Sequence, residues 1–267
     1  MFALIRGAGD LASGIALRLW HSGFDVVMTE LEHPTTIRRT VSFSEAVVKG
    51  RTEVEDVSAQ LAENVTHAKE LMKRNILPVF VDPDCRCREA LKPDILVDAI
   101  LAKRNLGTKI TDAPIVIGVG PGFEAGVDCH AVVETMRGHT LGRAIYQGGA
   151  LPNTNIPGRI GGFTGERVLR APDDGIFKGT RQIGDTVAAG DIAGYIGDKP
   201  MICTIGGVLR GLLADGTITH KGMKAGDVDP RGQKAYCYTV SDKALSVGGG
   251  VLEAILHLYT DKGEFYG

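Results

Sequence analysis

The first thirty residues alternate between apolar and polar segments in a way that predicts a strand, a turn, a helix and a second strand. Residues 2–6 form a short apolar run, and residues 11–20 carry large apolar side chains four positions apart, as on one face of a helix. Gly23 ends this helix, and residues 24–29 form the second apolar run. Together these elements have the size of one βαβ unit.

The same pattern continues to about residue 150. Residues 43–48 and 58–75 are predicted helices, and residues 77–81, 95–99 and 114–119 are apolar runs without polar alternation. Strands of that kind are buried on both faces, as in parallel sheets covered by helices. The pattern therefore predicts an α/β fold with a Rossmann-like, doubly wound parallel sheet.

The second half of the chain has a different texture. Residues 152–162 are rich in proline and glycine and are a predicted loop, and beyond them short β-like segments alternate with glycine turns. The segment Gly175-Ile-Phe-Lys-Gly179 recurs as Gly207-Val-Leu-Arg-Gly211. Two such halves predict a smaller, β-rich barrel-sandwich of the lipoyl or biotinyl kind. The hairpin between them carries Lys199 without flanking methionines, so no covalent lipoyl or biotin is expected.

The expected domains are a Rossmann-like nucleotide-binding domain at 1–155, a barrel-sandwich β domain at 156–241, and a C-terminal helix at 242–267 that packs on the rest. Three consecutive glycines, Gly248 to Gly250, interrupt this helix. Each costs roughly 1 kcal/mol of helix propensity against alanine. We expect them where the backbone packs closely on another element; close approach to a ligand is the alternative.

Composition limits the possible partners. The chain has 30 Lys and Arg against 32 Asp and Glu, so no basic excess favours nucleic acid. Its apolar runs are far shorter than the ~20 residues that a membrane helix needs, and the sequence opens without a signal-peptide pattern. The five cysteines lack a disulfide spacing. We expect a cytoplasmic protein that binds neither nucleic acid nor membrane; a homo-oligomer stays open.

The strongest chemical motif is the glycine turn Gly7-Ala8-Gly9-Asp10-Leu11-Ala12, which matches the dinucleotide pattern G-x-G-x-x-A. Its glycines permit a tight turn and close approach of a pyrophosphate, and the following helix directs its N-terminal N–H groups at that anion. Glu30 follows Gly9 by 21 residues, near the ~20 expected for an acid that binds a ribose hydroxyl. A nucleotide or dinucleotide is therefore expected here; strand–helix packing is the alternative, and the Asp10 carboxylate disfavours a pyrophosphate.

Two further groups are candidates for the same ligand. Gly118, Gly120 and Gly122 follow a predicted strand at its carboxyl end, where ligands bind in open α/β sheets. Arg38 and Arg39 could hold a phosphate through paired guanidinium groups. A plain turn and solvent-exposed arginines are the alternatives.

The sequence does not identify a catalytic residue, but four residues are candidates. Cys85 and Cys87 are flanked by arginines, which would lower a thiol pKa, but two thiols alone do not make a zinc site and no metal is expected. Asp128 and His130 would share one face of a strand, as metal ligands or as a base and its orienting group. Incidental cysteines and a polar strand edge are the alternatives. Whether the chain is an enzyme stays open.

Several motifs together carry a family resemblance: residues 6–12, Thr29-Glu30, residues 37–43, 98–105 and 118–126, Asp128-Cys-His130 and Arg170-Ala-Pro. Over nearly the whole chain they resemble the YqeB-type accessory proteins of the selenium-dependent molybdenum hydroxylase system. The resemblance implies a bacterial protein that helps to mature or support molybdenum hydroxylases, with the hydroxylase or other maturation proteins as partners. It also implies that a molybdopterin dinucleotide could occupy the glycine turn.

Three functions follow. The first is a maturation factor that binds a nucleotide-containing cofactor at residues 7–12, with Cys85 and Cys87 handling sulfur or selenium. The second is an NAD(P)-dependent oxidoreductase, for which no hydride acceptor or general acid is evident. The third is a non-catalytic assembly scaffold whose β domain docks on a hydroxylase subunit.

Overall fold

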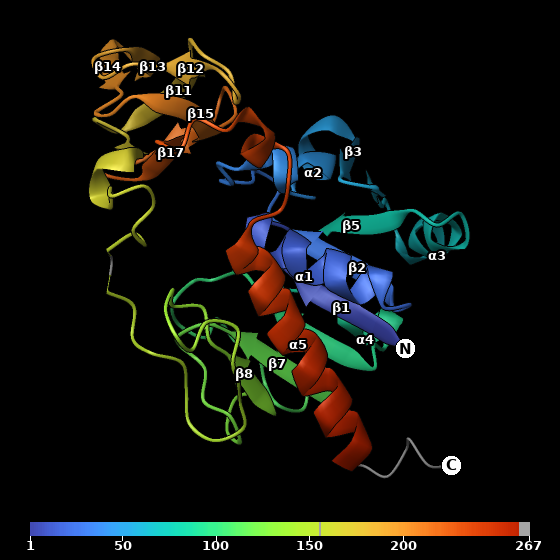
Figure 1. Cartoon of the computed structure of the whole chain (residues 1–267). Coiled ribbons are helices and arrows are strands. Elements are labelled where there is room, and N and C mark those ends of the chain that lie inside the picture. Colours follow the sequence, from blue (N-terminus) through green and yellow to red (C-terminus); the bar gives the residue numbers. More distant parts are fainter. Residues whose placement is uncertain (155, 262–267) are drawn as a thin grey trace. The chain divides into compact units, whose positions relative to one another are not determined.

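The computed structural model describes residues 1–154 and 156–261, and these form two compact units (Figure 1). The first unit contains Met1–Pro34, Phe43–Thr154 and the chain from Val240. The second contains Thr35–Ser42 and residues 156–239. Residues 35–42 therefore belong to the second unit, although the residues on either side, Pro34 and Phe43, belong to the first.

The first unit is built on a nine-stranded sheet of order β3-β4-β5-β2-β1-β6-β7-β8-β9. The strands are β1 (Phe2–Arg6), β2 (Asp25–Glu30), β3 (Arg51–Val54), β4 (Val57–Leu61), β5 (Leu77–Val81), β6 (Ile95–Asp98), β7 (Ile115–Val119), β8 (Ala131–Val133) and β9 (Ala144–Ile145). Neighbours from β4 to β8 are parallel. The pairs β3–β4 and β8–β9 at the two ends are antiparallel, so the sheet is mixed.

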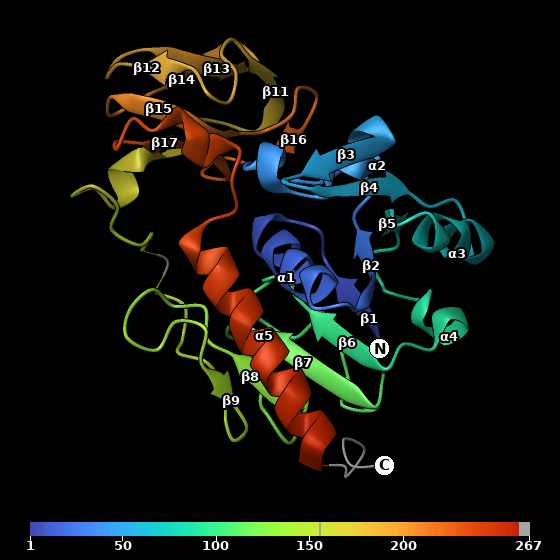
Figure 2. The ribbon, with the colours of Figure 1, turned by 45° about the vertical axis from the view of Figure 1, so that its right-hand side comes forward.

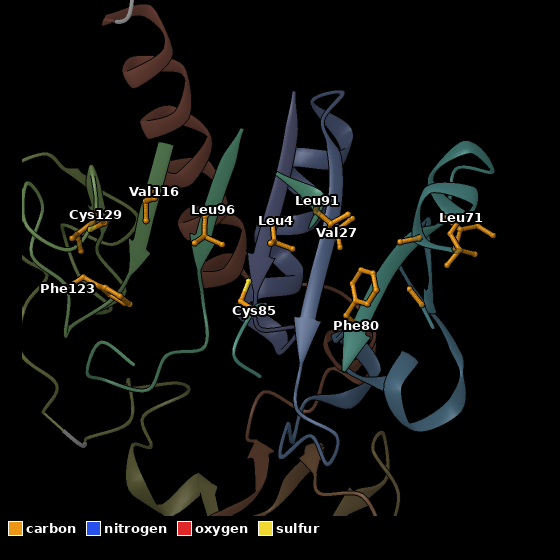
Figure 3. Close-up of a cluster of buried hydrophobic side chains, with 14 of the residues drawn as sticks. Leu4, Val27, Leu71, Phe80, Cys85, Leu91, Leu96, Val116, Phe123 and Cys129 are labelled. Atoms are coloured by element: carbon orange, nitrogen blue, oxygen red, sulfur yellow. The ribbon is translucent and has the colours of Figure 1, made fainter. Parts of the chain in front are cut away.

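Helices cover both faces of this sheet. They are α1 (Asp10–His21), α2 (Glu45–Lys49), α3 (Val65–Lys73), α4 (Arg88–Leu91) and α5 (Asp242–Asp261). Helices α1 and α5 lie side by side in both views of the ribbon (Figures 1 and 2). A core on the sheet contains Leu4, Val27, Leu96 and Val116 from four strands, with Leu71 of α3 and Leu91 of α4 packed against them (Figure 3).

Small residues bring α1 and α5 close together. A Cβ atom on Gly14 would lie 2.6 Å from the Cβ of Ala244, and one on Gly248 would lie 2.8 Å from the carbonyl oxygen of Gly14. A Cβ on Gly250 would lie only 1.9 Å from the carbonyl oxygen of Gly142. The expectation that the glycine run serves backbone packing is therefore confirmed for Gly248 and Gly250.

The second unit consists of two four-stranded antiparallel sheets, of orders β10-β17-β15-β12 and β14-β13-β11-β16. The strands are β10 (Val168–Arg170), β11 (Gly175–Gly179), β12 (Thr186–Val187), β13 (Ile192–Ile196), β14 (Lys199–Ile202), β15 (Gly207–Leu212), β16 (Ile218–Thr219) and β17 (Lys224–Asp229). Three short 3-10 helices, η1 (Arg39–Val41), η2 (Gly165–Arg167) and η3 (Lys234–Cys237), complete it. Ile37 joins the core between the sheets, together with Phe177, Leu209 and Val228.

The expected fold class is wrong. A Rossmann-like, doubly wound parallel sheet does not describe the first unit, because antiparallel strands close both ends of its sheet. For the second unit, the structure has two four-stranded antiparallel sheets in place of the expected lipoyl- or biotinyl-like barrel-sandwich. The repeated segments fall in β11 and β15, which belong to different sheets.

Most local predictions in the first unit are confirmed, with small differences at the element ends. The helix expected at 58–75 is wrong in its first part, because residues 51–61 form the β3–β4 hairpin and the helix begins only at Val65. Within β4 the buried side chains are Val57 and Ala59, two positions apart. This strand period was hidden because it runs directly into a helical one.

Candidate functional site

The glycine turn connects the end of β1 to the start of α1. Gly7 has φ +102°, and its N–H donates to the carbonyl oxygen of Thr29 at 2.9 Å. A Cβ there would lie 3.0 Å from the carbonyl oxygen of Ala99, so both the backbone angle and the space require glycine. Gly9 has φ −68° and caps α1, which begins at Asp10. As at the start of any α-helix, the first N–H groups of α1 make no hydrogen bonds within the helix.

Glu30 lies against the same turn. Its Oε2 accepts a hydrogen bond from the N–H of Ala8 at 3.0 Å, and its Oε1 accepts one from the N–H of Leu31 at 2.7 Å. Burial raises the pKa of Glu30, although the two backbone N–H groups act in the opposite direction. Each carboxylate oxygen can accept a further hydrogen bond, so Glu30 can receive a donor from a ligand at the turn.

Two serines, Ser13 and Ser44, contact the backbone of the turn. The carbonyl oxygen of Ala8 accepts hydrogen bonds from the N–H of Ser44 at 2.9 Å and from the hydroxyl of Ser13 at 3.2 Å. The hydroxyl of Ser44 is buried and has no hydrogen-bond partner within the described residues. Since a buried hydroxyl without a partner is costly, Ser44 is a candidate for contact with a bound molecule.

A buried ion pair beside the turn was not identified as a site from the sequence. Arg6, the last residue of β1, places its Nη1 at 3.2 Å from Oδ2 of Asp98, the last residue of β6. The same guanidinium donates to the hydroxyl of Thr108 and to the carbonyl oxygens of Pro83 and Leu106. Arg6 thus fixes the loops that follow β5 and β6. The sequence signal that could have identified this ion pair is a charged residue at the end of each of two buried apolar strands.

Cys85 and Cys87 lie in the loop between β5 and α4. Cys85 is buried with φ +56°, and the half-buried Cys87 donates its backbone N–H to Oδ2 of Asp82 at 2.7 Å. Contact with the Cys85 thiol, burial and the Asp82 carboxylate together raise the pKa of Cys87. The N–H of Asp82 donates to the carbonyl oxygen of Glu30 at 3.0 Å, so this loop and the glycine turn occupy the same edge of the sheet.

The expectation that flanking arginines lower a thiol pKa is wrong for Cys87. Arg86 turns to Asp84, with 2.9 Å between its Nη2 and the carboxylate. Arg88 donates to the carbonyl oxygen of Cys85 at 2.9 Å. Because both guanidinium groups are held elsewhere, a carboxylate rather than a cation sets the charge next to the Cys87 thiol.

The second glycine turn also follows the carboxyl end of a strand, β7. A Cβ on Gly118 would lie 2.4 Å from the ring of Phe123, and one on Gly122 would lie 2.5 Å from Cα of Arg104. Gly120 has φ +82°, and a Cβ there would lie 2.9 Å from the hydroxyl of Thr135. Packing accounts for all three glycines, so a plain turn explains them without a bound ligand.

Asp128 and His130 do not share a strand face, because β8 begins only at Ala131. Oδ2 of Asp128 accepts the N–H of Glu124 at 2.9 Å, within one turn. Nδ1 of His130 accepts the N–H of Val116 at 3.0 Å. The strand expected at 128–134 is confirmed only for Ala131–Val133, and Asp128 and His130 each hold a different piece of backbone.

Arg38 and Arg39 belong to the second unit. Nη2 of Arg38 donates to the carbonyl oxygens of Tyr236 at 3.0 Å and Thr239 at 3.3 Å. Nε of Arg39 donates to the carbonyl oxygen of Leu212 at 2.9 Å. These bonds fasten residues 35–42 to the unit and explain why paired arginines occur there.

A buried ion network lies within the second unit. Asp227 pairs with Arg167 and Arg210, at 2.7 Å for Nη2 of Arg210, and Asp229 pairs with Arg210 at 3.1 Å and Arg231 at 2.6 Å. The arginines hold the pKa of Asp229 below its usual value despite its burial. On the neighbouring hairpin, Lys199 pairs with Asp173.

Across residues 1–154 and 156–261, there is no group of three or more His, Cys, Asp or Glu side chains that could hold a metal ion. In the same part of the chain, no helix combines the length and apolar character needed to cross a membrane.

Among solved structures, the chain is similar to an aspartoacylase family protein from Mesorhizobium loti, at 11% identity over 85% of this chain and 83% of that chain, with a TM-score of 0.26. It is similar to the ectoine utilization protein EutE (DoeB) from Ruegeria pomeroyi, at 9% identity over 85% and 84%, again with a TM-score of 0.26. A succinylglutamate desuccinylase/aspartoacylase from Rhodobacter sphaeroides matches 30% of this chain and 25% of its own, at 20% identity and a TM-score of 0.22. TM-scores this low carry no inference about activity.

No protein-family model matches the chain. The uncharacterized protein YqeB of Escherichia coli strain K12 is 52% identical over 255 residues, which are 96% of this chain and 47% of YqeB. The chain thus spans about half the length of this curated relative. The match confirms the expected resemblance in part, without tying it to selenium or to molybdenum hydroxylases. Over the part of YqeB that it spans, the chain is therefore similar to this protein.

Proposed function

We propose that the chain is an accessory protein for the maturation of selenium-dependent molybdenum hydroxylases, and that it binds a nucleotide-containing cofactor at Gly7–Ala12. The observation that carries the binding proposal is the Glu30 carboxylate held against the turn by the N–H of Ala8 at 3.0 Å. A helix N-terminus such as that of α1 suits a phosphate, and the carboxylate suits a ribose hydroxyl. The maturation role rests on the family resemblance alone.

The ligand can be a molybdopterin dinucleotide or NAD(P), because both carry a pyrophosphate. Mass spectrometry of the small molecules released on denaturing the native protein distinguishes them. A pterin dinucleotide supports the maturation role, whereas a nicotinamide dinucleotide supports an oxidoreductase instead. Titration with NADH and NADPH, followed by their fluorescence, is the independent check, and no binding at millimolar cofactor excludes the oxidoreductase.

A charge placed on the turn tests the site itself. Gly9 has φ −68°, which every residue adopts, so Gly9→Asp adds a carboxylate without straining the backbone. Since a like charge against a phosphate costs several kcal/mol, we expect the affinity for the released ligand to fall at least about tenfold. Gly165→Asp is the matched control, because that glycine is exposed, lies in the second unit and has open space around it. Equal affinity in both variants would refute the site.

The maturation role has a separate readout. Hydroxylase activity in bacterial cells that produce only Gly9→Asp should fall relative to cells that produce Gly165→Asp at the same level. If nucleotide binding is lost and the activity of the hydroxylase persists, the ligand site exists but does not serve maturation.

A further inference from the structure

One sheet of the second unit has an apolar outer face. In the sheet of order β14-β13-β11-β16, side chains such as Phe177 and Met201 point into the core. Side chains alternate between the two faces of a strand, and those on the solvent side of an antiparallel sheet are usually polar. Here they include three isoleucines that are 60%, 50% and 68% exposed, namely Ile176, Ile202 and Ile218.

The strand register joins these side chains into one patch, which we call the isoleucine face. Residues directly opposite each other in antiparallel strands have Cβ atoms about 4.5–5.5 Å apart and therefore touch. A contiguous exposed apolar patch of this kind marks an interaction site more often than scattered apolar residues do. The isoleucine face consists of three cross-strand pairs: Ile176–Ile218, Lys178–Tyr195 and Ile192–Ile202.

The isoleucine face carries a single kind of charge, the ammonium group of Lys178. In the part of the chain that the structure describes, this group makes no hydrogen bond or ion pair. Covering the face would remove water from the ammonium group, which is costly unless the covering molecule supplies an opposite charge. The surface that fits this face is therefore apolar with one carboxylate.

A depression with polar walls adjoins the face. It shares Ile192 and Tyr195 with the isoleucine face, and Arg181 pairs with Asp191 at 3.6 Å along its wall. Protein interfaces commonly have an apolar centre and a polar rim. The depression gives a partner side chain a place to enter beside the apolar centre.

Two other occupants fit the charges less well. An isologous contact with a second copy would bring the same patch of both chains together, so that two Lys178 ammonium groups would meet at the cost of like-charge repulsion. An anionic membrane attracts basic surfaces. The two ends of the sheet instead carry carboxylates, with Asp174 and Asp198 at one end and Asp191 at the other.

We propose that the isoleucine face is a docking surface for another protein. That protein presents apolar side chains around one Asp or Glu carboxylate, and the carboxylate pairs with Lys178. Tyr195 supplies the large amphipathic side chain that is typical of the centre of an interface. The inference depends neither on nucleotide binding nor on the maturation role, because it concerns the second unit alone.

Carbodiimide cross-linking tests the pairing directly, since it joins an amine to a carboxylate in contact with it through an amide without a spacer. Cells of the native organism that produce the tagged chain are lysed and treated, and the peptides joined to Lys178 are identified by mass spectrometry. We expect an amide between Nζ of Lys178 and an Asp or Glu of another protein. No amide at Lys178, or an amide only to this chain itself, would overturn the proposal.

Calorimetric titration with the purified cross-linked protein then tests the face. Ile218→Asp and Lys178→Glu should each bind it at least about tenfold more weakly than the wild type. Replacing its linked carboxylate by lysine should restore binding to Lys178→Glu. Ile156→Asp is the matched control, because Ile156 is 70% exposed in the second unit and lies outside the face.

Equal affinity in all variants would overturn the proposal. If Ile218→Asp does not fold, Lys178→Glu and its charge-swapped partner decide alone. Sedimentation with phosphatidylglycerol vesicles covers the membrane alternative. Binding of the wild type to these vesicles that is lost in Ile218→Asp would overturn the protein partner in favour of a lipid surface.

Discussion

The glycine run in α5 allows a sharp test of packing, because neighbouring glycines have opposite surroundings. No atom lies within 4 Å of a Cβ built on Gly249, whereas one built on Gly250 lies 1.9 Å from the carbonyl oxygen of Gly142. Alanine at 249 gains helix propensity and should stabilise the fold by about 1 kcal/mol. Alanine at 250 must push the Gly142 loop outward by roughly 1.5 Å to reach ordinary contact, and should destabilise the fold by about 1–3 kcal/mol.

Urea unfolding followed by tryptophan fluorescence measures this difference directly. The chain has one tryptophan, Trp20, and it lies in α1, which packs on α5. The signal therefore reports the first unit. The two variants should differ by about 2–4 kcal/mol in free energy of unfolding, through a change of midpoint at constant slope. Equal midpoints for Gly249→Ala and Gly250→Ala would refute the packing explanation of these glycines.

Three further predictions concern buried charges. Asp98→Asn leaves the buried Arg6 guanidinium without its carboxylate and should cost about 3–5 kcal/mol in urea unfolding; Asp84→Asn, in an exposed pair, should cost about 0–1 kcal/mol, and similar losses would contradict the role of Asp98. Because burial raises the pKa of Glu30 above 4.5, its carboxyl adds stability at low pH that is lost as the pH rises through the folded-state pKa. The free energy of unfolding of Glu30→Gln, relative to that of the wild type, should therefore rise between pH 4 and pH 7. A difference in stability that does not change with pH would count against this. Asp227→Asn should destabilise the second unit by about 3–5 kcal/mol in calorimetry, and an unchanged melting curve would show that the ion network is dispensable.

The parallel strands could be predicted because each is buried on both faces and therefore reads as an apolar run. The glycine turn at residues 7–12 could also be predicted, since its constraints are local in sequence. The mixed character of the sheet could not, because its antiparallel ends depend on the short strands β3 and β9. Those strands are too brief to show a period of their own.

The errors at the candidate site have a common physical cause, which is contact between residues far apart in sequence. Arg6 and Asp98 are 92 positions apart and meet because β1 and β6 are neighbours in the sheet. Arg38 is fastened to the carbonyl oxygen of Tyr236, 198 positions away, and no local pattern assigns it to the second unit. The arginines beside Cys87 were expected to lower its pKa, but the folded loop determines which groups their side chains contact.

The central claim is that a nucleotide binds at the glycine turn, and calorimetric titration of the native protein tests it most directly. The titrants are NADH, NADPH and the dinucleotide released from the purified protein, each against wild type, Gly9→Asp and the control Gly165→Asp. We predict saturable binding of at least one of them to wild type and to Gly165→Asp, and at least about tenfold weaker binding to Gly9→Asp. Absence of binding to all three proteins, or equal binding to all three, would contradict the claim.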